Sequence, residues 1–174
     1  ENGRTLRDRA NKMSYEFAAR LSISDNCPFL NNRIRFLEQN KTTGRILDIE
    51  KWVEYTYGWF QNYPYTEVSP YGEEQIMQEL CNYFQAWYEI IGEDKWSGDT
   101  GCLFRTATQF RVILKRFEQI HQRAKTEQGM TITASRFKDA LSPLENIPFT
   151  DIDIFDAYND SGENAWKFLD AWVH

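Results

Sequence analysis

The sequence predicts a mainly α protein, a single-domain helical bundle of about five to six helices with room for one short strand or hairpin. Apolar residues recur at spacings of three and four along most of the chain, which is the period of an amphipathic helix. Residues that start or end helices, such as Pro70 and Gly92, flank these stretches. The 174 residues fit one domain, 1–174, with subregions 1–61, 70–127 and 130–174. Because residue 1 is not Met, we expect a fragment of a longer chain.

The first predicted helix covers residues 4–21 and ends before the turn formers that precede Pro28. Its apolar stripe consists of Leu6, Ala10, Met13, Phe17 and Leu21. A short extended segment is expected near residues 33–37. The second helix is expected to run from a cap at Asp48 to about Phe60, and Gly58 weakens its last turn. Its inward residues are Ile49, Trp52, Val53 and Phe60, with Thr56 as a weak polar member.

The longest predicted helix covers residues 70–91, with a cap at Ser69, Pro70 at its first position and Gly92 at its end. The clearest periodicity belongs to the central helix, residues 103–125. Its stripe consists of Leu103, Ala107, Phe110, Leu114, Phe117 and His121, widened by Ile113, Ile120 and Ala124. A small helix is expected over residues 134–141, and a last helix should follow the capping pattern at residues 160–163.

Charge is distributed in alternating blocks along this acidic chain of net charge −6. Residues 1–45 carry +4, residues 46–102 carry −9, residues 103–142 carry +5 and residues 143–174 carry −6. A uniformly acidic shell would argue against nucleic acid, whereas two basic segments could form a patch or could pair with the acidic blocks. The polar face of the central helix is the most basic, with Glu118 as its one acid.

The sequence contains no motif of a catalytic, cofactor or metal site, so we expect none and predict a protein that is not an enzyme. Its two histidines are His121, which falls on the apolar side of the central helix and is interpreted as packing, and the terminal His174. Cys27, Cys81 and Cys102 are far apart in the sequence and lack metal-ligand spacing, so they are interpreted as reduced core thiols of a cytoplasmic protein. No stretch of 18 apolar residues occurs, which argues against a membrane span.

Four groups of residues match a known family in their order along the chain. They are Asn11-Lys12-Met13, then residues 24–34 with Asp25, Pro28 and Asn32-Arg33-Ile34, then Leu103-Phe104-Arg105-Thr106 leading into residues 110–115, and last Asn159-Asp160-Ser161-Gly162. This pattern resembles the helical C-terminal region of DGQHR-domain proteins, the group that includes regulators of bacterial DNA phosphorothioation. The Asp-Gly-Gln-His-Arg motif itself is absent and would lie upstream, so no site residue is carried over.

The resemblance implies a bacterial, cytoplasmic module that acts in DNA modification, defence or transcription regulation. Together with the basic blocks, it leads us to expect contact with the DNA backbone, without sequence readout. The candidate DNA-binding residues are Arg4, Arg7, Lys12, Arg33, Arg35, Arg105, Arg111, Lys115, Arg116 and Arg123.

Two other functions are left open by the sequence. One is a scaffold for a protein partner or a second copy of the chain, which would use an exposed aromatic surface. Its candidate residues are Trp59, Tyr65, Tyr71 and Trp96. The other is a part of an enzyme whose active site needs a missing N-terminal region.

Overall fold

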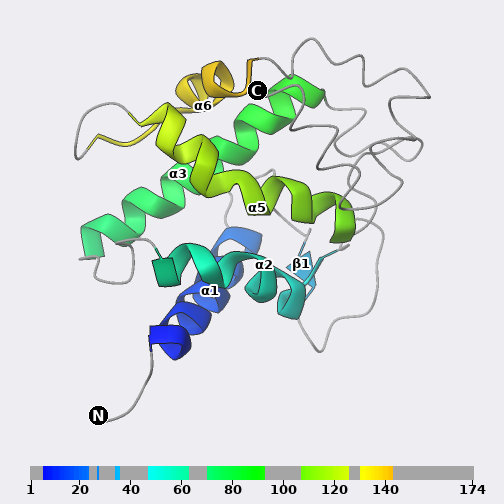
Figure 1. Ribbon diagram of the computed structural model, residues 1–174, viewed down its shortest axis with the longest axis vertical. Coiled ribbons are helices and arrows are strands. Elements are labelled where there is room, and N and C mark those ends of the chain that lie inside the picture. Colours follow the sequence, from blue (N-terminus) through cyan, green and yellow to red (C-terminus); the bar gives the residue numbers. More distant parts are fainter. Residues whose placement is uncertain are drawn as a thin grey trace. The chain divides into compact units, whose positions relative to one another are not determined.

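A computed structural model describes residues 6–23, 27, 34–35, 47–62, 70–92, 107–125 and 130–142. These residues form five helices and two strands of two residues each (Figure 1). The elements are α1 (Leu6–Ile23), β1 (Ile34–Arg35), β2 (Leu47–Asp48), α2 (Ile49–Asn62), α3 (Pro70–Ile91), α5 (Ala107–Ala124) and α6 (Ala134–Ala140). The prediction of a mainly α protein is therefore confirmed.

The chain divides into two compact units, residues 1–81 and residues 82–174, and the division falls inside α3. The first unit contains α1, both strands, α2 and the first half of α3. The second unit contains the remainder of α3 with α5 and α6. The prediction of one domain over residues 1–174 remains a prediction.

The bounds of α3 agree with the prediction for residues 70–91. Pro70 is its first residue, where the missing N–H costs no helical hydrogen bond. Gly92 follows its last residue with a φ of 89°. Glycine adopts this left-handed conformation readily because it has no Cβ that could clash with the backbone. The N–H of Gly92 still donates to the carbonyl of Tyr88 at 2.8 Å, so the last turn of the helix is closed before the chain leaves it.

The other predicted helices differ from the structure at their ends. Helix α1 ends two residues later than predicted, while residues 4 and 5 of the prediction lie outside the described residues, and α2 continues through Gly58 to Asn62. Helix α6 ends one residue earlier than predicted, at Ala140. The first four residues of the predicted central helix, 103–106, lie outside the described residues, as does the predicted last helix after residues 160–163.

The extended segment expected near residues 33–37 contains β1, which pairs in parallel with β2. The register places Ile34 opposite Leu47 and Arg35 opposite Asp48. Parallel strands cannot be joined by a tight turn, so the pair is not a hairpin. The partner strand lies at the position where the sequence suggested a helix cap, and α2 follows Asp48 directly.

Helices α1 and α2 pack against each other in the first unit, and a buried polar network crosses their contact. The indole Nε1–H of Trp52 donates to the carbonyl of Ser14 at 2.8 Å. The Thr56 hydroxyl donates to the carbonyl of Trp52 at 2.7 Å, so the Ser14 hydroxyl is the donor in its own bond to Thr56. Ser14, Trp52 and Thr56 are all fully buried. Thr56, the weak polar member of the predicted stripe, is therefore buried in the core with its hydroxyl hydrogen-bonded.

We expect Thr56→Val to lower the free energy of unfolding by about 1–3 kcal/mol, because valine preserves the volume but leaves the buried Ser14 hydroxyl without its acceptor. Chemical denaturation with urea would measure the change. The same substitution at the exposed Thr131 is the matched control and should change stability by less than about 0.5 kcal/mol. An equal effect at both positions would show that the network contributes nothing.

Candidate nucleic-acid interface

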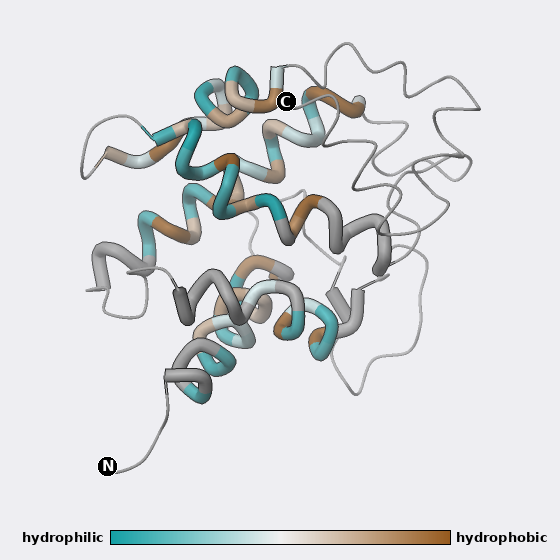
Figure 2. Tube along the Cα trace, in the orientation of Figure 1, coloured by the Kyte–Doolittle hydropathy of each residue, from teal (hydrophilic) through white to brown (hydrophobic). Residues whose placement is uncertain are grey.

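Helix α5 buries one side in the second unit, as the periodicity predicted. The buried residues on it are Ile113, Leu114, Phe117, Ile120, His121 and Ala124. Hydrophobic and hydrophilic residues alternate along the helix, as Figure 2 shows. The half-buried Arg116 and Glu118 and the exposed Arg123 lie off this apolar side. Burial of one side therefore fixes which residues of α5 face water.

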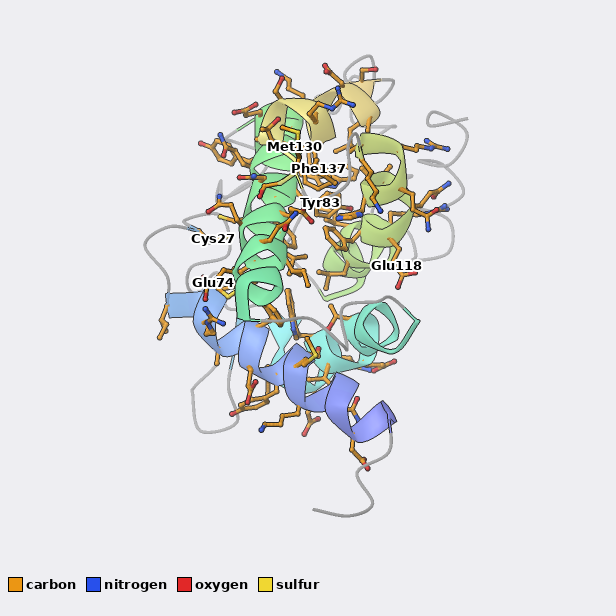
Figure 3. The ribbon with its side chains drawn as sticks, turned by 90° about the vertical axis from the view of Figure 1, so that its left-hand side faces the viewer. Cys27, Glu74, Tyr83, Glu118, Met130 and Phe137 are labelled. Carbon is orange, nitrogen blue, oxygen red and sulfur yellow. The ribbon has the colours of Figure 1, made fainter. Side chains whose placement is uncertain are left out.

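Tyr83 of α3 is the centre of the core that holds α5 and α6 (Figure 3). Its hydroxyl donates to the carbonyl of Ile113 at 2.6 Å. Its ring makes edge contacts with four aromatic rings at centroid distances of 5.1–6.4 Å. They are Phe84, Trp87, Phe117 and Phe137. Because such pairs have a preferred geometry, this cluster fixes the orientation of α5 more sharply than aliphatic packing would.

The pKa of the Tyr83 phenol is raised far above its usual value, chiefly because burial penalises the phenolate. The positive charge of Arg116 opposes this effect. The phenol therefore stays protonated and remains a donor. Such a group anchors a structure and is unsuited to proton transfer near neutral pH.

Helix α6 is placed by two contacts at its start. Asn82 of α3 donates its side-chain N–H to the carbonyl of Ile132 at 2.8 Å. Thr133 caps the helix, because its hydroxyl accepts from the backbone N–H of Arg136 at 3.3 Å. Phe137 then points into the aromatic cluster and is fully buried. These contacts fix the position of the first turn of α6, which carries Arg136.

Three exposed cations lie at the C-terminal end of α5, and we name Arg123, Lys125 and Arg136 the α5-end cations. Arg123 lies in the last turn of α5, and Lys125 follows the helix with its N–H donating to the carbonyl of His121 at 2.9 Å. Arg136 joins them from α6, since its Nε–H donates to the carbonyl of Ala124 at 3.4 Å. Cations at this end also interact favourably with the negative end of the helix dipole.

Two other predicted DNA-binding residues have described side chains, and both make contacts within the protein. Lys12 is exposed but lies 3.6 Å from the carboxylate of Glu16. Arg116 is half-buried and its guanidinium donates to the side-chain oxygen of Gln119. Arg123 is the third predicted DNA-binding residue with a described side chain, and it belongs to the α5-end cations.

The remaining predicted basic residues have no described side chains. Arg7 lies in α1, Arg35 in β1, and Arg111 and Lys115 in α5, as backbone positions only. Outside the described residues altogether are Arg4, Arg33 and Arg105. The candidate list omitted Lys125 and Arg136. Both lie in the segment 103–142 that carries a charge of +5, and this charge is the feature of the sequence that could have identified them.

The predicted aromatic surface cannot be assembled from the described side chains. Trp59 and Tyr71 are backbone positions of α2 and α3, and their side chains lie outside the description. Tyr65 and Trp96 lie outside the described residues. The protein-scaffold alternative remains a prediction.

His121 is buried, as its place in the apolar stripe predicted. Its ring lies 5.3 Å from that of Phe117 and 6.3 Å from that of Phe137. Within the part of the chain that the structure describes, no group of three His, Cys, Asp or Glu side chains could hold a metal ion. A search of the same residues finds no helix that is both long enough and apolar enough to cross a membrane.

Searches of protein-family models, of curated proteins and of solved structures found no match to the chain.

Glu118 is the acidic residue of α5, on the side of the helix away from Tyr83 (Figure 3). Its pKa is raised because partial burial penalises the carboxylate. The folded protein then binds this proton more tightly than the unfolded chain, so the stability contributed by Glu118 falls as pH rises through the unfolded-state and folded-state pKa values.

We expect Glu118→Gln to stabilise the protein at pH 7, since the amide removes the cost of a half-buried charge. The gain should stay below about 1 kcal/mol, because water still screens the group, and it should shrink at pH 4. Denaturation with urea at both pH values measures it. The exposed Glu54, which pairs with Lys51 at 2.8 Å, provides a control, and Glu54→Gln should give no such gain. A loss of stability in Glu118→Gln at pH 7 would contradict the interpretation.

Proposed function

We propose that the chain is a non-enzymatic helical module that contacts the phosphate backbone of DNA through the α5-end cations. The observation that carries this proposal is the presence of three exposed cations at the C-terminal end of α5, where Arg123 and Lys125 are joined by Arg136 of α6 through its bond to the Ala124 carbonyl. Phosphate contact needs several cations held at one surface, and it needs no particular base sequence.

The rigidity of the site also supports the proposal. The bond from Arg136 to the end of α5, the cap at Thr133 and the packing of Phe137 hold the two helix ends together. Less side-chain and backbone freedom is then lost when a ligand binds. The acidic net charge of −6 does not oppose local binding, because screening at physiological salt limits the reach of distant charges to about 8 Å.

The resemblance to DGQHR-domain proteins supports a setting for this activity. It suggests a bacterial, cytoplasmic protein in DNA modification, defence or transcription regulation. The motif groups over residues 11–13, 24–34, 103–115 and 159–162 carry this part of the proposal.

The test is the salt dependence of binding to two duplexes of unrelated sequence. If all three α5-end cations contact phosphates, the logarithm of the association constant should fall against the logarithm of salt concentration with a slope of about −2.7. Both duplexes should bind alike. Fluorescence anisotropy between about 50 and 200 mM salt measures this range, over which the affinity of phosphate contacts falls steeply.

Two variants assign the binding to this surface. Arg123→Gln and Lys125→Gln should each weaken binding and reduce the slope by about 0.9, the effect of one phosphate contact. Lys51→Gln is the matched control, because Lys51 is an exposed lysine of α2 outside the cluster, and it should leave the slope unchanged. Binding that is insensitive to salt, or that keeps its full salt dependence when Arg123→Gln and Lys125→Gln are combined, would refute the proposal.

A further inference from the structure

The first unit brings together two cysteines that are 54 positions apart in the sequence, Cys27 and Cys81. Both are in the thiol form and their side chains are hydrogen-bonded to each other. Cys81 belongs to α3, and Cys27 follows the end of α1 (Figure 3). Two sulfur atoms in contact meet the first requirement for a disulfide, which joins side chains whose Cβ atoms are about 4 Å apart.

The two thiols differ in how they meet solvent. Cys27 is 1% exposed and Cys81 is 6% exposed, so a small oxidant reaches Cys81 first. The hydrogen bond from Cys27 lowers the pKa of the Cys81 thiol, against the opposing effect of burial. The thiolate is the reactive form of cysteine, and the greater exposure of Cys81 assigns it as the attacking residue and Cys27 as the resolving residue.

We propose that Cys27 and Cys81 form a reversible disulfide when the protein meets a hydroperoxide. In the first step the Cys81 thiolate attacks the terminal peroxide oxygen, the O–O bond breaks, and the hydroxide or alkoxide leaves and takes up the proton lost by the Cys81 thiol, which gives water or an alcohol. Cys81 is oxidised to a sulfenic acid and the peroxide is reduced. The sulfur of Cys27 then attacks the sulfur of Cys81. The S–S bond forms as the S–O bond breaks, and the oxygen leaves as water with the proton of Cys27.

The disulfide covalently ties the segment at residue 27 to α3, to which α1 is also linked by the surface ion pair of Arg20 and Glu74. An exposed ion pair contributes little to stability, whereas a bond across 54 positions restricts the unfolded chain strongly. A dithiol reductant restores both thiols by exchange. This device is independent of the proposed DNA contact, since the α5-end cations lie in the other unit.

The experiment treats the reduced, folded chain with hydrogen peroxide, removes the peroxide, and then unfolds the chain in iodoacetamide so that buried thiols are blocked as well. Peptide mass spectrometry maps the cysteines. We expect a linked pair of peptides that contain Cys27 and Cys81, with Cys102 alkylated as an internal control. The link should disappear after dithiothreitol, and oxidised chain should melt several degrees above the reduced chain.

Variants separate this pair from the third cysteine. Cys102→Ser should leave the Cys27–Cys81 link intact, and Cys81→Ala should abolish it and leave Cys27 alkylated. Any of three results in the wild-type chain would overturn the proposal: both thiols alkylated after oxidation, Cys81 converted to sulfinic acid beside a reduced Cys27, or a link from either cysteine to Cys102. The wild-type measurement needs no substitution in the core, so it does not depend on how the variants fold.

Discussion

The second unit depends on the buried hydroxyl of Tyr83, which donates to the carbonyl of Ile113 at 2.6 Å from the middle of an aromatic cluster. A phenol without an acceptor in that position would lose a hydrogen bond that water can no longer replace. The bond therefore restricts α5 to positions in which the Ile113 carbonyl faces α3. The edge contacts of the ring with Phe117 and Phe137 extend this restriction to both helices whose ends carry the α5-end cations.

Buried hydrogen bonds also fix how the helices pack in the first unit. Ser14, Trp52 and Thr56 exchange three hydrogen bonds in the contact between α1 and α2, and all three are fully buried. Apolar packing alone would tolerate a shift of one helix along the other, whereas a satisfied polar network has one register. Each unit thus combines a generic apolar contact with a specific buried polar one.

The proposed DNA contact and the proposed disulfide need residues in different environments. Phosphate contact by Arg123, Lys125 and Arg136 requires exposure, and their position at the C-terminal end of α5 also offsets the helix dipole when no ligand is bound. The chemistry proposed for Cys27 and Cys81 requires burial, because it needs two thiols held in contact and open to small oxidants only. The first property depends on salt and the second on redox state, so they can be measured separately in one preparation.

The sequence by itself determined the fold class, the existence of the five described helices and the buried side of α5. The 3.6-residue period of Leu114, Phe117 and His121 suffices for such predictions, and the pairing of Pro70 with Gly92 located both ends of α3, because these signals are local. Only the tertiary structure decided which polar residues face each other. Arg136 at the end of α5, Thr56 on Ser14 and Cys81 beside Cys27 are contacts across 12, 42 and 54 positions. Periodicity assigns a residue to one face of its own helix, but the partner of that face is set by how the helices pack.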